Sequence, residues 1–277
     1  MNKMNLKESP SIAGKNKKFY ELKRVCAGKI LDLHKKAKAG HIGSSLSCLD
    51  ILIYSHFFKM KSADHFILSK GHAASALYTI LAKKGLFPEQ YLETYYRDGT
   101  LLAAHPPAGK LNGITFGTGS LGHGLSLAAG IALSARFSRK KFQVYCVLSD
   151  GDCNEGSTWE AALFAGHHGL GNLTVIIDNN EMQALGKTKE VLNLEPLKQK
   201  WASFNFTVAV TRDGNNFDDL HNAFGDLDKS NSNQPKCLIA KTKLGHGVSF
   251  MEDRLEWHYL PMNDEQYQKA KLEIKNV

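Results

Sequence analysis

The chain has 277 residues, of which 43% are hydrophobic and 22% are charged. This balance excludes a disordered chain, and no apolar run approaches the roughly 18 residues needed to cross a bilayer. The length allows one or two domains, and the sequence has no Pro- or Ser-rich linker that would separate two. Five cysteines without a CxxC pair predict free thiols in a reducing compartment. We therefore expect a soluble, single-domain, cytoplasmic protein.

The net charge of +8 at pH 7 is unevenly distributed along the chain. Residues 1–18 contain five lysines and one glutamate, and so carry half of the excess. This composition predicts a flexible basic tail over residues 1–18, followed by one domain over residues 19–277. The remaining lysines are scattered without interleaved aromatic residues, so we expect neither nucleic acid nor a membrane as a partner.

Short apolar runs rich in β-branched residues alternate along the chain with segments of helical period. The expected strands are residues 66–68, 142–148, 173–178, 206–211 and 237–242. The expected helices are residues 19–39, 47–58, 73–84, 121–137, 158–168, 217–229 and 263–275. Because these strands are apolar throughout, they are expected to be covered on both faces. The order predicts an α/β fold with a doubly wound, mostly parallel sheet, helices on both faces and ligands at the carboxyl ends of the strands.

Polar loops follow two of the predicted strands. Asp150 and Gly151 come directly after one strand, and Asn180 follows the next strand 30 residues later. A carboxylate and carbonyl oxygens, completed by phosphate oxygens, commonly hold Mg²⁺ or Ca²⁺ on a diphosphate. The glycine would let a ligand approach the backbone closely. Ordinary turns use the same residue types, so the pair of loops together, and neither loop alone, indicates a site.

The spacing from Asp150 to Asn180 resembles the thiamine diphosphate motif, and the surrounding sequence resembles the transketolase family. Further blocks match in the family's order over residues 40–44, 68–73, 117–124, 155–170 and 257–258, with His105 between them. The resemblance covers residues 20–262 and implies the thiamine diphosphate-binding fold. Ser149 departs from the motif, where glycine is usual. Leu244 stands where some members have lysine, a role that Lys241 or His246 could take over.

The resemblance implies a role for each matching residue. The metal ligands would be Asp150, Asn180 and the backbone carbonyl of Met182, binding Mg²⁺ with Ca²⁺ or Mn²⁺ as substitutes. Glu155 and Glu160 match acidic positions that link the two cofactor sites in family dimers. The residues expected to contact the cofactor are His72, Gly119, Ser120, Leu121, Gly151, Asn180 and His258.

The resemblance also places His41, His105 and His258 around the reacting atoms. Transketolases transfer a two-carbon ketol unit from a ketose phosphate to an aldose, with thiamine diphosphate as the electron sink. Hydroxyl protons of the sugars must be removed and returned near neutral pH, where imidazole titrates. Four of the twelve histidines, including His72, fall in the matching blocks, which favours a shared catalytic site over isolated packed histidines.

Transketolases continue beyond the matching region into a pyrimidine-binding domain. The resemblance therefore implies the N-terminal subunit of a split transketolase, active with a separate C-terminal subunit in an assembly with two copies of each. The α subunit of a 2-oxoacid dehydrogenase is an alternative, because it shares the metal motif, but decarboxylation does not need the polyol-binding histidines. A non-catalytic protein that binds nucleic acid through the basic tail is a third hypothesis. The sequence leaves the identity of the sugar phosphates open.

Overall fold

The computed structural model describes residues 11–230 and 233–276 and contains one parallel five-stranded sheet. Its order is β1-β2-β3-β7-β6, and each neighbouring pair is parallel. The strands are β1 (His65–Leu68), β2 (Val144–Ser149), β3 (Leu173–Asn179), β6 (Thr207–Val210) and β7 (Lys236–Lys241). All five predicted strands and the doubly wound fold class are confirmed.

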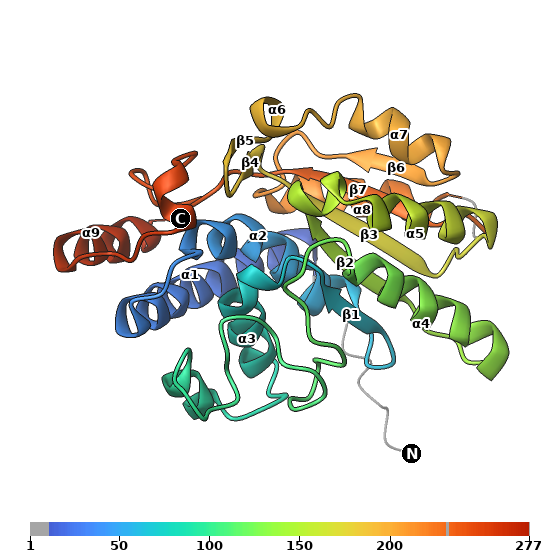
Figure 1. Cartoon of the computed structure of the whole chain (residues 1–277). Coiled ribbons are helices and arrows are strands. Elements are labelled where there is room, and N and C mark those ends of the chain that lie inside the picture. The colour runs from blue at the N-terminus through green and yellow to red at the C-terminus, as the bar shows by residue number, and fades with distance from the viewer. Residues whose placement is uncertain (1–10, 231–232, 277) are drawn as a thin grey trace, which may run out of the picture.

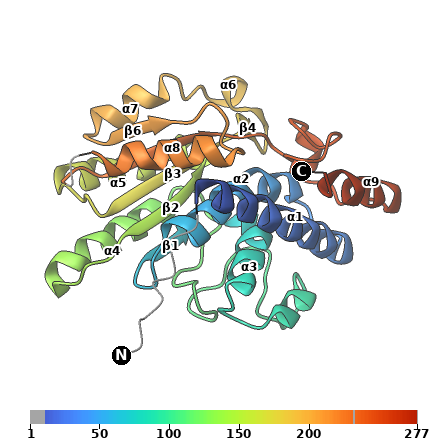
Figure 2. The ribbon, with the colours of Figure 1, turned by 180° about the vertical axis from the view of Figure 1, so that it is seen from behind.

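Helices cover both faces of the sheet (Figures 1 and 2). One face carries α1 (Ile12–Ala37), α2 (Ile42–Tyr54), α3 (Ala74–Lys83) and α8 (Phe217–Asp228). The other carries α4 (Gly124–Ser138), α5 (Gly156–His167) and α7 (Leu197–Ser203). Along β2, Tyr145 and Val147 belong to the first core, and Cys146 and Leu148 belong to the second. Two buried faces explain why the strand sequences do not alternate.

The N-terminal helix starts earlier than the sequence predicts. Ser11 caps α1, its Oγ accepting a hydrogen bond from the backbone N–H of Gly14 at 3.2 Å. Residues 12–18 are therefore helical, and the prediction of a flexible tail is wrong for them, because the cap and the buried Phe19 extend the helix toward the N-terminus. Residues 1–10 of that predicted tail lie outside the described residues.

Several short elements carry no strong sequence signal. A two-stranded hairpin of β4 (Met182–Gln183) and β5 (Gly186–Lys187) follows β3 and leads into α6 (Thr188–Val191). The last helix, α9 (Asp264–Ile274), lies beside α1 (Figure 1). Its capping box joins Asn263 and Gln266. The short 3-10 and π-helical segments are η1 (Ser55–Lys59), η2 (Gly71–Ala73), η3 (Glu89–Thr94), η4 (Gly151–Asn154) and η5 (Leu255–His258). Among the helices of the described residues, none is both long and apolar enough to span a bilayer.

The register of the sheet brings its functional loops to one level. Ser149 of β2 pairs with Asp178 of β3, and Asn179 of β3 pairs with Lys241 of β7. The chain therefore leaves these three central strands at the same edge. The loops that begin with Asp150, Asn180 and Thr242 start side by side, as expected for the carboxyl ends of parallel strands.

Candidate cofactor site and active site

The carboxylate of Asp150 lies under the loop that follows β3. It is almost fully buried, and it accepts hydrogen bonds from Nδ2 of Asn179 at 2.7 Å and Oγ1 of Thr188 at 3.1 Å. Burial raises the pKa of Asp150 to about 7, despite these hydrogen bonds. A buried carboxyl group with a raised pKa holds its proton to higher pH, and a cation bound next to it would favour the ionised form.

Asn180 and Met182 lie in the loop that covers Asp150. Oδ1 of Asn180 accepts a hydrogen bond from the backbone N–H of Met182 at 3.0 Å, while its Nδ2 donates to Oγ of Ser47 at 2.9 Å. The three predicted ligands therefore offer a carboxylate, an amide oxygen and a backbone carbonyl, the oxygen donors that Mg²⁺ and Ca²⁺ take. No group of three His, Cys, Asp or Glu residues able to hold a metal occurs within residues 11–230 and 233–276. A cation here would depend on amide, carbonyl and phosphate oxygens.

A buried ion pair lies behind this loop. Nζ of Lys70, which follows β1, contacts Oδ2 of Asp178 near the end of β3, and both side chains are at most 1% exposed. Burial alone would lower the pKa of Lys70, but the charge and hydrogen bond of Asp178, together with the charges of Cys48 and Asp150, outweigh burial and the pKa is raised. Ser47 and Thr242 also donate to Asp178. No single sequence motif contains the members of this network, so it could not be predicted from the sequence.

The structure brings the four predicted histidines together from four segments of the chain. The ring centroid of His41 lies 5.6 Å from that of His72, 6.3 Å from that of His105 and 5.1 Å from that of His258. His41 has a left-handed backbone, with φ of 65°, at the start of α2, and its N–H donates to the carbonyl of His258 at 3.1 Å.

The imidazoles of this cluster are held in their neutral forms. Burial lowers the pKa of all four, and it brings that of His258 to about 4. The charge of Lys70 also lowers the pKa of His41, His72 and His258. Nδ1 of His258 is buried without a hydrogen-bond partner in the described structure. Neutral rings near pH 7 can accept protons from hydroxyl groups or donate to developing alkoxides.

The glycine-rich loop over residues 117–124 lies between the histidines and Asp150. A Cβ on Gly119 would lie 2.9 Å from the ring of His105, and one on Gly151 would lie 2.8 Å from Cδ1 of Leu121. The loop that carries Gly119, Ser120 and Leu121 therefore touches both parts of the candidate site. This packing accounts for glycine at positions 119 and 151.

Asp152 anchors this loop, a role that the sequence analysis did not predict. Its fully buried carboxylate accepts from Oγ of Ser69 at 2.6 Å and from the backbone N–H of Gly122 at 2.8 Å. It also accepts from Oγ of Ser149 at 3.0 Å. Ser149 ends β2 without a positive φ, so serine fits where the motif has glycine. One feature of the sequence could have indicated this role: Asp152 is a second acidic residue, after Asp150, directly following the buried strand β2.

A cavity of about 950 Å³ opens beside the loop that follows β3 and is lined by Asn180, Thr188 and Lys241, among others. Leu244 is fully buried against Gly43 and cannot contribute to it. His246 does not line this cavity, and its Nδ1 lies 3.4 Å from a carboxylate oxygen of Glu252. Of the two candidates for replacing a lysine at position 244, only Lys241 lies next to the cavity.

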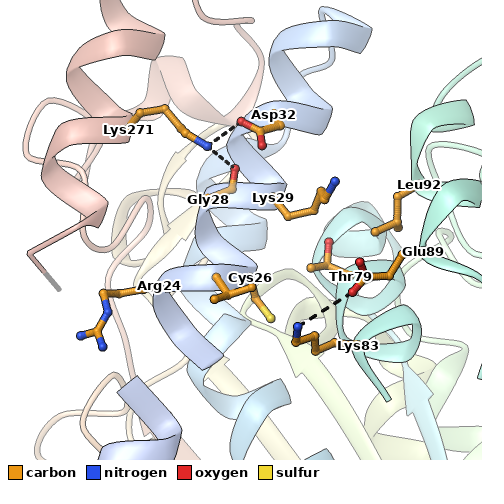
Figure 3. Close-up of a pocket in the computed structure, with 11 residues that line it drawn as sticks. Arg24, Cys26, Gly28, Lys29, Asp32, Thr79, Lys83, Glu89, Leu92 and Lys271 are labelled. Carbon is orange, nitrogen blue, oxygen red and sulfur yellow. Dashed lines mark hydrogen bonds and ion pairs between the residues drawn. The ribbon is translucent and has the colours of Figure 1, made fainter. Parts of the chain in front are cut away.

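A second hollow of about 280 Å³ lies among α1, α3 and η3 (Figure 3). Its charges are largely satisfied internally, with Lys271 bonded to Asp32 at 2.8 Å and Lys83 lying 3.9 Å from Glu89. None of the predicted site residues lines it. Glu155 and Glu160 do not line this hollow either. Both are exposed, Glu155 just before α5 and Glu160 within that helix.

The fold and the site together define an α/β domain with polar loops at the carboxyl edge of a parallel sheet and a cluster of neutral histidines. Residues 17–275 match the family model described as "Transketolase, thiamine diphosphate binding domain". The chain is 36% identical to one of the subunits of the apulose-4-phosphate transketolase of Phocaeicola vulgatus, over 89% of this chain and 90% of the relative. It is 37% identical to the 6-deoxy-6-sulfo-D-fructose transketolase subunit SqwG of a Clostridium species, over 87% and 90%.

Solved structures agree with these relatives. The transketolase of Campylobacter jejuni superposes with a TM-score of 0.86 at 26% identity, covering 93% of this chain and 42% of that one. The chain belongs to the transketolase family. It spans about two fifths of the length of that solved enzyme and nearly the whole length of the relatives named as subunits.

Proposed function

We propose that the chain is the N-terminal subunit of a split transketolase, transferring a two-carbon ketol unit from a ketose phosphate to an aldose acceptor. The observation that carries the proposal is the convergence of four histidines, His41, His72, His105 and His258, into one cluster. The glycine-rich loop connects this cluster to the turn after Asp150, because it packs against both His105 and Gly151. A 2-oxoacid dehydrogenase α subunit would share the metal-binding loops, but it needs no such cluster. The family match also favours transketolase over that alternative.

In this proposal Asp150, Asn180 and the carbonyl of Met182 hold Mg²⁺, and Gly151 and Leu121 lie against the diphosphate. Thiamine diphosphate, when bound, supplies the electron sink for breaking and forming the carbon–carbon bond. The neutral imidazoles of His41, His105 and His258 remove and return the hydroxyl protons of the sugars. His72 and His258 also contact the cofactor, and the unpartnered Nδ1 of His258 gives it a free polar atom for that contact.

A separate C-terminal subunit would complete the site. The relatives named as transketolase subunits are nearly as long as this chain. Three exposed leucines form an apolar rim near the proposed cofactor site: Leu185 in the β4–β5 hairpin, Leu192 after α6 and Leu260 after η5. They are 82%, 58% and 53% exposed, respectively. A partner that covers this rim would shield both the apolar side chains and the cofactor from water. We expect two copies of each chain, with Glu155 and Glu160 facing the paired site.

The substrates would be sugars that carry an anionic group. The two relatives are named for apulose 4-phosphate and 6-deoxy-6-sulfo-D-fructose, which each carry an anionic group. The four histidines would bind the shared ketol end, and the anionic end would be bound largely by the partner. The five cysteines are free and buried, which fits work in the reducing cytoplasm.

The test is to express the chain with the C-terminal transketolase subunit of the same organism and purify the complex. Ketol transfer is then assayed with Mg²⁺ and thiamine diphosphate over a panel of ketose phosphates, sulfonated ketoses and aldose acceptors. Transfer to at least one acceptor supports the proposal. Cofactor-dependent decarboxylation of 2-oxoacids without any ketol transfer would contradict it.

A further inference from the structure

Ser47 joins the buried Lys70–Asp178 ion pair to the proposed metal ligand Asn180. Ser47 lies on α2 and Asp178 on β3, and both are fully buried. Oγ of Ser47 is 2.8 Å and 2.9 Å from the two carboxylate oxygens of Asp178, and it is 2.9 Å from Nδ2 of Asn180. One hydroxyl therefore bridges the charged pair and the amide.

The chemistry of these groups fixes the direction of each hydrogen bond. The Asp178 carboxylate, paired with Lys70, can only accept. Ser47 has a single hydroxyl proton, so it donates that proton to Asp178. Thr242 also donates its hydroxyl proton to Asp178. It therefore has no proton left to donate to Ser47, whose oxygen lies 3.2 Å away. The oxygen of Ser47 is left with lone pairs alone.

Asn180 must therefore turn its NH₂ group toward Ser47. Its Oδ1 then points toward the loop that carries Met182, whose N–H it meets at 3.0 Å. An amide oxygen has a second lone pair that remains available to a cation. The reversed amide would set two donors against that cation and would leave Ser47 without a donor.

We infer that Ser47 is a positioning residue, whose hydroxyl locks the side-chain amide of Asn180 with its oxygen toward the cation site. The inference rests on the proposed function, which makes Asn180 a ligand. Lys70 and Asp178 in turn orient Ser47. The Asp178 carboxylate, ionised by its pairing with Lys70, can only accept, so the Ser47 hydroxyl donates its proton to Asp178. The metal site has a single carboxylate, Asp150, so the orientation of the amide oxygen matters for the affinity.

The test measures thiamine diphosphate binding to the chain in complex with its C-terminal subunit, by calorimetry at a series of Mg²⁺ concentrations. Ser47→Ala should raise the Mg²⁺ concentration for half-maximal cofactor binding by about 10-fold, the effect of losing a partner that orients a ligand. Ser47→Cys keeps the shape but accepts hydrogen bonds weakly, and it should show a similar loss if Ser47→Ala does not fold. Ser47→Thr retains the hydroxyl and should restore the affinity.

The matched control is Ser45→Ala on the same helix. Ser45 is equally buried, but its hydroxyl accepts from Oγ of Ser75 at 2.8 Å and takes no part in the Asp178 network. This variant should bind Mg²⁺ and cofactor like the wild type. If Ser47→Ala and Ser47→Cys match Ser45→Ala, the inference is overturned while the proposed function stands. Wild-type complex that binds the cofactor without any need for metal would overturn both.

Discussion

Leu121 of the glycine-rich loop rests on Gly151 of the turn after β2, so closely that a Cβ on Gly151 would lie 2.8 Å from Cδ1 of Leu121. The Leu121 tip is flexible, and we expect Gly151→Ala to fold with less than about 1 kcal/mol lost in its free energy of unfolding. The added methyl must displace Leu121 toward the diphosphate site. Cofactor affinity of the complex should therefore fall severalfold, as calorimetry would detect.

Gly71→Ala provides the contrast to Gly151→Ala. A Cβ at Gly71 would lie 2.6 Å from the backbone carbonyl oxygen of Thr118, which cannot rotate away. We expect this variant to lose about 1–3 kcal/mol in chemical denaturation. Equal stability losses in the two variants, or unchanged cofactor affinity in Gly151→Ala, would contradict the packing argument.

Asp150→Asn should separate metal binding from folding. Because burial raises the pKa of Asp150 to about 7, its ionised form costs stability in the metal-free chain, and this cost grows as the pH rises from about 4 to 7. Asparagine removes the charge, and the Thr188 hydroxyl can rotate to accept from it. We expect a metal-free thermal midpoint at pH 8 equal to or above that of the wild type. Mg²⁺-dependent cofactor binding should fall by about 100-fold.

Asp152→Asn is the matched control for that variant, because Asp152 is equally buried two residues away. Its carboxylate serves donors from Ser69, Gly122 and Ser149, so the substitution should lower the free energy of unfolding. If Asp150→Asn retained tight, metal-dependent binding of thiamine diphosphate, Asp150 would not be a ligand.

The histidine cluster should give the assembled enzyme an acid-tolerant rate profile. Burial lowers the pKa of His258 to about 4 and lowers that of His41 below its ordinary value. A lowered pKa means that protonation needs a lower pH, so kcat should hold as the pH falls through 6.5 and decline only below it. His41→Ala and His258→Ala should each lower kcat by about 10²-fold. A rate that halves near pH 6.5, or variants with normal turnover, would contradict this assignment.

Much of the sheet and the histidine cluster was predictable because both signals are dense in the sequence. Strands such as β2 and β3 are buried on both faces and read as continuous apolar runs. The candidate ligands follow those strands directly, so parallel topology alone brings Asp150 and Asn180 to one edge. Short elements such as β4 and α6 are stabilised by contacts made only in the fold, and they lack a periodic pattern.

The supporting network was not predictable, for a different physical reason. Ser47, Lys70, Asp178 and Thr242 come from four segments, and their common feature is a distance in space. A buried lysine looks like any surface lysine until its partner is known. The start of α1 was missed similarly, because the lysine-rich residues 15–18 mask the cap at Ser11.

His56 should make the chain sensitive to acid. Both of its ring nitrogens are buried without a hydrogen-bond partner among the described residues, and burial lowers its pKa to about 3. Below pH 6.5 the His56 imidazole is protonated in the unfolded chain, while in the folded chain it stays neutral down to about pH 3. This group alone therefore removes about 1.4 kcal/mol of stability per pH unit as the pH falls from 6.5 toward 3.

His56→Met should remove that dependence at similar volume. In denaturant unfolding, we expect the variant to gain about 2 kcal/mol over the wild type on going from pH 7 to pH 5. His167→Met makes the same replacement at an exposed histidine of α5 and is the control for the histidine-to-methionine change. Parallel stability curves for His56→Met and the wild type would refute the role of His56.

The purified chain should bind thiamine diphosphate weakly and should have no ketol transferase activity by itself. The histidines and the candidate metal ligands lie on this chain, but the apolar rim with Leu185 and Leu260 is exposed, so water reaches the cofactor edge. The resemblance to transketolases places the carboxylic acid that contacts the aminopyrimidine ring on the C-terminal domain. Adding the cognate C-terminal subunit should therefore restore transfer, with activity that saturates at one partner per chain. Leu185→Asp should raise the partner concentration needed for half-maximal activity. Phe137→Asp, at an exposed position near the C-terminal end of α4 and remote from the glycine-rich loop, serves as the comparison. Turnover by the lone chain at the rate of the complex would show that no partner is required.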